Sequence, residues 1–461
     1  MKTDTIAAIA TALSNSGIGI IRISGEDAVS ITDKMIVNKN HNSFINKMKS
    51  HTIHYGFVVD EKREVVDEVM VSLMKKPNSF TTEDIVEINC HGGVLVMKRI
   101  LELVIKNGAR LAEPGEFTKR AFLNGRIDLS EAEAVMDVIS SKNDIALKSS
   151  VKQLRGSVYH KIKNIRDSII YEIAFIESAL DDPEHISLDG YPEKLSDKVD
   201  MISLDVEKLL STAESGKIIK EGISTVIVGK PNAGKSSLLN ILAGEDKAIV
   251  TEIAGTTRDI LEEDINLHGI NLHVIDTAGI RSTEDIVEKI GVEKARKYAL
   301  EADLIIYVVD SSVPLDENDI QIIHIIKDKK CIVLFNKYDL DSKISIDDLK
   351  LRLGSNVSVI KTSTKENKGI DDFEQTVMEM FFHGDISVNE ELLITNMRHK
   401  EALMEALSSL NQVKKSLDAN MPEDFYSIDL MSAYASLGKI TGEEVEEDLV
   451  NEIFSKFCMG K

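Results

Sequence analysis

A single glycine-rich loop constrains the fold of this chain more than any other stretch. The apolar residues 225–228 precede a G-x-x-x-x-G-K-S pattern from Gly229 to Ser236, and an apolar helical stretch follows it. The glycines let backbone N–H groups curl around phosphate oxygens, and the N-terminus of the next helix adds the positive end of its dipole. In such a loop Lys235 reaches the terminal phosphates and Ser236 ligates Mg²⁺. The pattern predicts a strand–loop–helix unit that binds a nucleotide, with a plain glycine-rich turn as the alternative.

The composition is that of an ordinary soluble protein with about three domains. The chain has 461 residues, of which 43% are hydrophobic, and its formal net charge is -22. An acidic chain repels nucleic acid on average, so contact with RNA requires a local basic patch or a basic partner. Cys90, Cys331 and Cys458 form no C-x-x-C pair, which argues against a disulfide scaffold or a zinc site. No apolar run of about twenty residues occurs, so we expect a cytoplasmic protein without a membrane span.

Residues 217–382 alternate apolar strands with helical stretches, which predicts a mostly parallel sheet with helices on both faces. Polar motifs follow several of the strands. The motif that begins at Asp276 places a carboxylate to hold Mg²⁺ through water, and its Gly279 N–H to sense a third phosphate. The carboxylate of Asp339 can accept two hydrogen bonds from guanine, whereas adenine presents the wrong edge. A loop at 363–365 is placed to touch the base, so the motifs together predict GTP.

The order of these motifs is similar to that of translation-factor-like GTPases. It runs GKPNAGKS, TTRD, DTAG, NKYD and ST-K along the chain. The segment 255–259 resembles the version found in the tRNA-modification GTPase family MnmE (TrmE). The resemblance implies that Thr257 joins Ser236 on Mg²⁺ when a switch loop closes. It implies GTP contacts from Asn232, Ala233, Gly234, Lys235, Ser236, Ser237, Thr251, Glu252, Ile253, Ala254, Gly255, Thr256, Thr257, Asp276, Thr277, Ala278, Gly279, Asn336, Lys337, Asp339, Ser363 and Thr364.

One departure from Ras-like proteins bears on hydrolysis. Ile280 follows the DTAG motif where those proteins carry glutamine, and isoleucine cannot orient an attacking water. The family resemblance supplies a potassium ion, which would stabilise charge near the phosphates as an arginine finger does. It implies catalytic roles for Lys235 and for Glu288, the match to the family's water-orienting glutamate; an ordinary solvated charge is the alternative for Glu288. The implied K⁺ ligands are Asn232, Thr251, Ile253 and Thr256.

Residues 1–120 have the pattern of a small α+β domain. Strands are expected at 18–23, 52–59, 68–74 and 85–90, and a helix at 94–107. A His-Gly-Gly turn after the last strand could indicate a hydrolase oxyanion loop, but no G-x-S-x-G motif accompanies it. A plain strand-to-helix turn is therefore favoured, and the residues alone leave the ligand of this domain open.

The MnmE resemblance extends to this front domain through the segments 19–25, 78–84 and 114–118. In the family the domain binds tetrahydrofolate and dimerises. Cations suit the folate carboxylates, and an acid suits the N–H donors of the pterin. Carried over by position, the contacts to 5-formyl-tetrahydrofolate would come from Arg22, Glu87, Arg126 and Lys461.

Helical stretches lie on both sides of the nucleotide region, at 121–216 and 383–461. Ser130 and Glu133 read as a capping box, and one long helix is expected after them, with a continuous apolar stripe from 151 to 176. Each stripe needs a partner, so the economical arrangement packs both halves as one bundle with the nucleotide domain 217–382 inserted. Two independent helical domains are the alternative. Further helices are expected at about 193–214, 403–417, 431–437 and 443–457, with breaks at Ser215-Gly216 and Gly438.

The chain ends in Phe457-Cys458-Met459-Gly460-Lys461, which resembles the F-C-[IM]-G-K ending of the MnmE family. A cysteine three residues before the chain end is expected to be a reactive thiol on a mobile tail rather than part of a core, and the family ending supports a catalytic role for Cys458. An incidental cysteine is the alternative from the residues alone.

The complete resemblance implies a multidomain α/β protein in which a P-loop GTPase domain is inserted in a helical bundle behind the front domain. The expected activity is that of a K⁺-stimulated homodimeric GTPase. With the FAD protein MnmG (GidA), in a heterotetramer or larger complex, it would install a carboxymethylaminomethyl or aminomethyl group at C5 of the wobble uridine (U34) of certain tRNAs. The one-carbon donor would be 5,10-methylene-tetrahydrofolate.

Two other classes remain as alternatives. A ribosome-assembly GTPase that acts as an RNA-binding switch predicts a basic KH-like appendage, which the sequence lacks. A filament- or membrane-associated scaffold predicts amphipathic basic helices, whereas the helical stripes are expected to have acidic outer faces.

Overall fold

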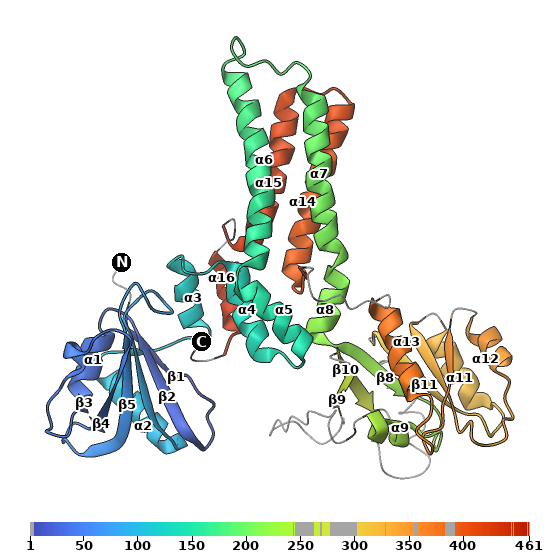
Figure 1. The fold of residues 1–461 in the computed structure, drawn as a ribbon, viewed down its shortest axis with the longest axis horizontal. Coiled ribbons are helices and arrows are strands. Elements are labelled where there is room, and N and C mark those ends of the chain that lie inside the picture. Colours follow the sequence, from blue (N-terminus) through green and yellow to red (C-terminus); the bar gives the residue numbers. More distant parts are fainter. Residues whose placement is uncertain are drawn as a thin grey trace. The chain divides into compact units, whose positions relative to one another are not determined.

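The chain folds into two compact units (Figure 1). The first comprises residues 1–136, 152–202 and 405–461, and the second comprises 137–151 and 203–404. The second unit therefore interrupts the first in sequence. The computed structural model describes residues 4–242, 244, 262–267, 270–276, 302–327, 329–354, 357–382, 392–443, 445, 447–458 and 460.

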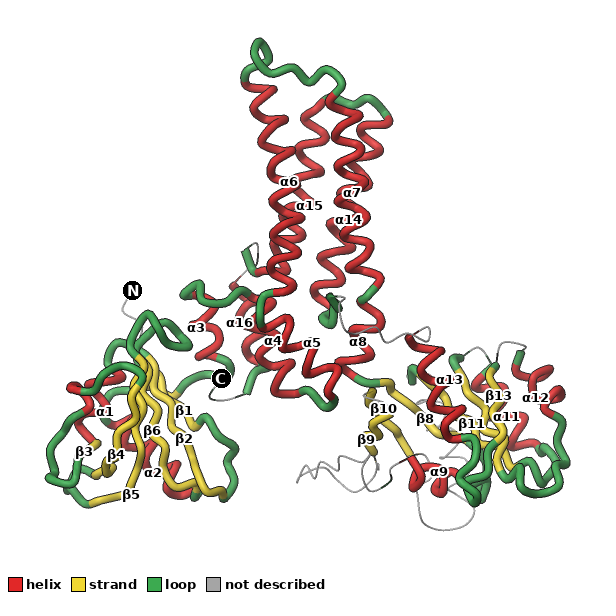
Figure 2. The backbone as a smooth tube through the Cα atoms, in the orientation of Figure 1, coloured by secondary structure: helices red, strands yellow, loops and turns green. Residues whose placement is uncertain are grey.

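The first unit begins with a seven-stranded sheet in the order β3-β4-β5-β6-β2-β1-β7 (Figure 2). The predicted strands are confirmed as β2 (Ser16–Ser24), β4 (Thr52–Val59), β5 (Val65–Met74) and β6 (Ile85–Gly92). The sequence did not reveal the short strands β1 (Ile6–Ile9), β3 (Ile36–Val37) and β7 (Arg110–Leu111). Two helices bury apolar faces in the core of this sheet, α1 (Ala28–Met35) and α2 (Val94–Lys106).

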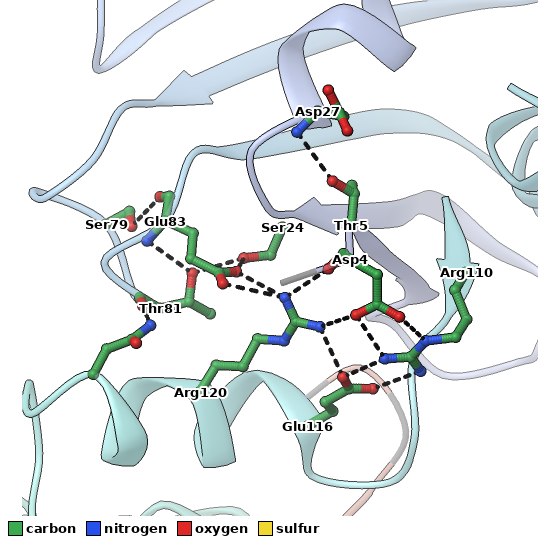
Figure 3. Close-up of polar contacts among 11 residues, drawn as sticks. Asp4, Thr5, Ser24, Asp27, Ser79, Thr81, Glu83, Arg110, Glu116 and Arg120 are labelled. Atoms are coloured by element: carbon green, nitrogen blue, oxygen red, sulfur yellow. Dashed lines mark hydrogen bonds and ion pairs between the residues drawn. The ribbon is translucent and has the colours of Figure 1, made fainter. Parts of the chain in front are cut away.

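A cluster of charges ties helix α3 (Glu116–Leu123) to the start of this sheet (Figure 3). Arg120 is only 7% exposed. Its guanidinium donates to the backbone carbonyl of Asp4 at 2.9 Å, to the Glu83 carboxylate at 3.1 Å and to Glu116 at 2.9 Å. In buried clusters of this kind, removing one partner costs about 3–5 kcal/mol because it leaves an uncompensated charge.

Arg110 closes the same cluster from the other side. It donates to Asp4 at 2.6 Å and to Glu116 at 2.7 Å, so Glu116 faces two guanidinium groups. Burial would raise the pKa of Glu116, but hydrogen bonds from Arg110, the Glu113 backbone and Arg120 outweigh it and lower the pKa. The cluster therefore stays ionised, and it holds α3 in place.

The two helical halves of the chain pack together within the first unit, as predicted. Helix α6 (Ser157–Asp181) lies beside α15 (Glu423–Thr441), where Ser427 donates a hydrogen bond to Glu177 (Figure 1). Asp200 of α7 (Tyr191–Ser211) forms an ion pair with Lys414 of α14 (Met397–Asp418). Helix α16 (Glu447–Ser455) adds Phe454 to an apolar cluster that includes Leu129.

The expected long helix after residue 130 is wrong. Three helices stand in its place, α4 (Leu129–Ser140), α5 (Asp144–Leu154) and α6. Gly156 has a φ of 81°, a left-handed conformation that interrupts the helix. The apolar stripe is therefore divided between α5 and α6. The predicted capping box is also displaced. Asp128 and Glu131 form it, since each side chain accepts a hydrogen bond from the other's backbone N–H, at 2.8 and 2.9 Å.

Two expected breaks fall inside helices. Ser215 and Gly216 belong to α8 (Ala213–Glu221), and Gly438 belongs to α15. A Cβ on Gly216 would stand 2.2 Å from the carbonyl oxygen of Ile394. Gly216 is thus explained by a close backbone approach rather than by the end of a helix, and sequence pattern does not separate the two cases.

The second unit contains a six-stranded sheet in the order β13-β12-β11-β8-β10-β9, parallel throughout except for β9. Alternate residues of the central strands enter two cores: Ile227 and Ile306 face one, and Val226 and Tyr307 face the other. The predicted parallel sheet with two covered faces is therefore confirmed. The strands are β8 (Ile223–Val228), β9 (Glu262–Leu267), β10 (Ile270–Asp276), β11 (Leu304–Asp310), β12 (Cys331–Asn336) and β13 (Ser358–Lys361).

Helices cover this sheet, and their caps agree with local sequence. Helix α11 begins with a capping box in which the Asp316 side chain accepts from the Asp319 backbone N–H and the Asp319 side chain accepts in return. Cys331 lies in the core as predicted, and burial raises the pKa of its thiol to about 12. The helices are α8, α9 (Lys235–Leu242), α11 (Glu317–Ile326), α12 (Ile346–Leu353) and α13 (Ile370–Phe382).

Candidate functional site

The glycine-rich loop joins β8 to α9 with the backbone that phosphate binding requires. Gly229, Asn232 and Gly234 have φ values of 150°, 63° and 108°. Lys235 begins α9, and its Nζ donates to the carbonyl oxygens of Gly229 at 2.7 Å and Lys230 at 2.8 Å. The ammonium group is thus held directly over the loop, where an incoming phosphate would offer it stronger acceptors.

The two glycines are also needed because of close neighbours. A Cβ on Gly229 would stand 2.3 Å from the carbonyl oxygen of Val308, and one on Gly234 would stand 2.1 Å from Nδ2 of Asn336. Real Cβ atoms do not approach other atoms so closely. The two glycines of the G-x-x-x-x-G pattern therefore stand where the loop comes into close contact with strands β11 and β12.

Asn336 connects the phosphate loop to the segment expected to contact the base. It is fully buried at the end of β12. Its Nδ2 donates to the carbonyl of Ala233 at 2.8 Å, and its Oδ1 accepts from the backbone N–H of Thr364 at 3.1 Å. The sequence predicted Asn336 as a ligand contact; in the structure its amide bridges two loops on either side of the site.

Asp339 has the exposure and ionisation that guanine recognition needs. Its carboxylate is exposed and accepts a hydrogen bond from the Ser363 hydroxyl at 2.8 Å. This hydrogen bond is the main cause that lowers the pKa of Asp339, so the group is an anion at neutral pH. Structure and sequence thus agree on placing Asp339, Ser363 and Thr364 in one group.

Two ion pairs that sequence reasoning missed support these loops. Lys337 donates to Asp310, the last residue of β11, at 2.6 Å. Lys230 pairs with Asp319 at 2.6 Å, and Asp319 is only 1% exposed. The only signal for these pairs in the sequence was an acidic residue at the end of a strand or at the cap of a helix. Each acid lies far from its lysine along the chain, so the sequence did not indicate which lysine it would pair with.

Much of the predicted site lies outside the described residues. This holds for Thr251, Glu252, Ile253, Ala254, Gly255, Thr256, Thr257, Thr277, Ala278, Gly279, Ile280 and Glu288. Asp276 ends β10 beside β8, but its side chain is not described. Ser236 and Ser237 are exposed in the first turn of α9, and the Ser236 hydroxyl is the hard oxygen donor that Mg²⁺ prefers.

The front domain gathers a second group of predicted residues within the first unit. Arg22 and Glu87 lie opposite each other on β2 and β6 and form an ion pair at 2.8 Å. Arg22 also donates to the carbonyl of Gly460 at 3.1 Å. The Gly115 N–H donates to the carbonyl of Cys458 at 3.4 Å. The tail therefore lies against this domain with an exposed Cys458, while Lys461 lies outside the described residues.

Arg22 and Arg126 are related through one aromatic cluster. The guanidinium of Arg22 lies 5.7 Å from the centre of the Phe117 ring, and that of Arg126 lies 4.8 Å from the Phe80 ring. Phe80 and Phe117 belong to the same apolar cluster. Arg22, with its partner Glu87, and Arg126 thus lie over rings of one apolar cluster, while the folate contacts expected of them stay a prediction.

No helix in the described part of the chain combines the length and apolar character needed to cross a bilayer.

The chain is similar to known proteins over its whole length. A family model described as the GTP-binding protein TrmE N-terminus matches residues 5–126, and one described as the MnmE helical domain matches 129–458. The tRNA modification GTPase MnmE of Lachnoclostridium phytofermentans is 60% identical over 461 residues, covering 100% of both chains. That of Acetivibrio thermocellus is 51% identical, again over 100% of both chains. The chain belongs to the MnmE family.

Among solved structures, the G domain of the T. maritima FeoB iron transporter is 31% identical, covers 34% of this chain and 97% of its own, and has a TM-score of 0.27. As an MnmE-family protein with this phosphate loop and this base site, the chain is a GTP hydrolase that uses Mg²⁺.

The close approach at Gly234 can be tested against a matched glycine. Gly234→Ala should weaken binding of a fluorescent GTP analogue by roughly ten-fold or more, because the new methyl group would displace the Asn336 amide. Gly354→Ala is the control: its φ of 106° imposes the same backbone strain, but nothing lies within 4 Å of its Cβ position. Equal affinities for the two variants would contradict the role assigned to the close approach between Gly234 and the Asn336 amide.

Proposed function

We propose that this GTPase modifies C5 of the wobble uridine (U34) in certain tRNAs together with the FAD protein MnmG. The product would carry a carboxymethylaminomethyl or aminomethyl group, with 5,10-methylene-tetrahydrofolate as one-carbon donor. Both full-length relatives described above are tRNA modification GTPases. The observation that carries the proposal is the joint position of Arg22, Glu87 and the Cys458 tail in a protein that also has a guanine-type nucleotide site.

The roles in the nucleotide site follow from the contacts. Lys235 would leave the two loop carbonyls to bind the terminal phosphates, and Ser236 with Thr257 would hold Mg²⁺, which neutralises phosphate charge. Asp339 would accept the guanine N–H groups while Ser363 keeps it in place. Glu288 is our candidate for orienting water. The remaining motif residues listed in the sequence analysis would contact GTP as predicted there.

Potassium is the proposed source of charge stabilisation, because Ile280 cannot take the part of a glutamine. Asn232 is exposed in the loop with a φ of 63°, and its amide supplies a neutral oxygen of the kind K⁺ prefers. Thr251, Ile253 and Thr256 would complete the site. The ion would supply positive charge beside the phosphates.

Hydrolysis rates in two salts test this. GTPase activity should be at least about ten-fold higher in KCl than in NaCl, and Asn232→Ala should remove that difference through loss of a ligand. Asn240→Ala, an exposed asparagine of α9, should retain it. Equal rates for the native chain in both salts would refute the potassium mechanism.

Folate binding is the proposed role of the front domain. Arg22 and Arg126 offer guanidinium groups to the folate carboxylates, Glu87 offers a carboxylate to the pterin N–H donors, and Lys461 would add a cation. Phe80 beneath Arg126 is half-buried and offers part of its ring, whereas Phe117 beneath Arg22 is fully buried. Cys458 is the proposed reactive thiol because its side chain is exposed. The hydrogen bond that its carbonyl accepts from the Gly115 N–H holds it at this domain.

Calorimetry with 5-formyl-tetrahydrofolate tests the folate assignment. Arg22→Gln should weaken binding by about ten-fold or more, because a charge-assisted hydrogen bond contributes roughly 1.5–3 kcal/mol. The control is Arg99→Gln, which removes an exposed arginine paired with Glu102 on α2 of the same domain. Unchanged affinity in Arg22→Gln would contradict the assignment.

The tRNA role has a direct cellular test. Cells that lack the protein should lose the modified wobble uridine from their tRNA, as measured by nucleoside mass spectrometry. The native chain and the control Lys350→Ala, an exposed lysine of α12, should restore it, whereas Lys235→Ala should not because GTP hydrolysis is lost. An unchanged nucleoside profile in the deletion strain would instead favour the ribosome-assembly alternative.

The assembly completes the proposal. The front domain (1–120) would form a homodimer, the helical domain (121–216 and 383–461) would transmit movements of the GTPase domain (217–382), and MnmG would join as a heterotetramer or larger complex in the cytoplasm. Support comes from the bundle in which segments from both sides of the second unit pack together.

A further inference from the structure

Residues 152–166 differ in charge from the rest of the chain. Acidic residues make up 77 of the 461, or about one in six, yet none occurs in this segment. It contains five basic side chains, Lys152, Arg155, Lys161, Lys163 and Arg166. The expectation that the helices have acidic outer faces is therefore wrong at the start of α6. A local excess of positive charge in an acidic chain suggests a negatively charged ligand.

The structure exposes most of these charges at the turn between α5 and α6. Gly156, with a φ of 81°, redirects the chain there. Arg166 takes no part, because it is buried, pairs with Glu443 and lies 4.0 Å from the Tyr434 ring. Three of the basic side chains and one histidine are exposed around the turn, and we name these four residues the elbow surface: Lys152, Arg155, His160 and Lys163.

The elbow surface combines cations with aromatic rings. Nζ of Lys163 lies 5.8 Å from the centre of the Tyr159 ring, and the His160 ring lies 5.4 Å from it. Within the described residues, neither Arg155 nor Lys163 forms an ion pair with a carboxylate. Their charges are therefore available to an external anion.

Glu131 is one carboxylate beside the turn at Gly156, and it already has a structural role. It accepts from the Asp128 backbone N–H at 2.9 Å in the capping box of α4. Burial is the main cause that raises its pKa, against the opposing charges of His160 and Arg126. Glu131 thus lies at the turn of the elbow surface, where its Oε1 is 3.1 Å and the His160 ring 3.5 Å from the Cβ position of Gly156.

This position links the elbow surface to the front domain. Arg126 donates to the carbonyl of Phe80 at 3.0 Å and stacks on its ring. Phe80 belongs to the same cluster as Phe117, over which Arg22 lies.

We propose that the elbow surface binds the phosphate backbone of the tRNA substrate. The proposal rests on the proposed tRNA function and specifies where the RNA lies. A guanidinium group matches phosphate geometry, and aromatic rings beside the cations suit the unstacked bases of an RNA loop. An acidic peptide would use the cations but not the rings. Because the chain as a whole carries -22, a local basic surface also decides how RNA approaches it.

A charge-reversal pair tests the proposal in the full-length protein. The variant Arg155→Glu/Lys163→Glu should bind fluorescein-labelled tRNA at least about ten-fold more weakly than the native chain at 0.1 M KCl. The slope of log affinity against log salt should fall by about two, one for each lost phosphate contact. The neutral pair Arg155→Gln/Lys163→Gln should lower the slope in the same way with a smaller loss of affinity.

The matched control changes the same net charge elsewhere in the same unit. Lys194→Glu/Lys198→Glu reverses two exposed lysines of α7 and should leave both affinity and salt slope close to native. GTP hydrolysis without RNA should be unchanged in both pairs, and an unchanged circular dichroism spectrum and thermal midpoint should show that the helices of the first unit are folded. Equal tRNA affinity of the elbow and control pairs would overturn the proposal.

Two further outcomes separate this proposal from its foundation. If the native chain binds tRNA but the elbow pair binds it equally well and loses only binding to labelled polyglutamate, the surface takes an acidic protein and the RNA assignment is wrong. If the native chain binds no tRNA and the deletion strain keeps its wobble modification, the proposed function itself fails. Loss of tRNA binding in the elbow pair, with an intact control, supports both.

Discussion

The hydrogen-bonded amide of Asn336 is the contact on which the nucleotide site depends. It is buried at the carboxyl end of β12, where it holds Ala233 of the phosphate loop and Thr364 of the base loop at the same time. Replacing it would leave buried backbone groups without partners, at about 1–3 kcal/mol each. The neighbouring strand β11 contributes Asp310 for Lys337 and a carbonyl that only a glycine can approach. The phosphate loop and the proposed base loop are thus positioned by the carboxyl ends of β11 and β12.

The front domain shows the same principle with charges. Arg110 and Arg120 hold Glu116 at the first turn of α3, and Gly115 just before it touches the tail. A Cβ on Gly115 would stand 2.6 Å from the carbonyl of Phe454 in α16 and 2.8 Å from Cβ of Phe457, so the end of α16 and the residue before Cys458 pack directly on this backbone. The buried ion cluster therefore fixes the surface against which Cys458 lies. The contacts that stabilise this cluster therefore also help to position the Cys458 thiol.

Local patterns were reliable where chemistry is local. The loop from Gly229 to Ser236, the strand β4 and the apolar run of β12 appear as expected because glycine spacing and apolar runs carry their own structural preference. Boundaries were less reliable where a glycine had two possible reasons. Gly216 and Gly438 lie within helices, while Gly156 breaks one, and only packing against Ile394 or a left-handed φ separates these cases.

The sequence by itself determined the nucleotide, the family and the order of the domains, because phosphate and guanine recognition need particular residue types at short fixed spacings. Tertiary structure decided which distant residues support them: Asp319 beneath Lys230, Asp310 beside Lys337, and Arg120 between Asp4 and Glu83. It also decided that the segment 152–166 turns at Gly156 and presents three cationic side chains and His160 at one surface. Such pairings depend on how the chain folds back on itself, and the separation of two residues in the sequence does not reveal whether they meet in the fold.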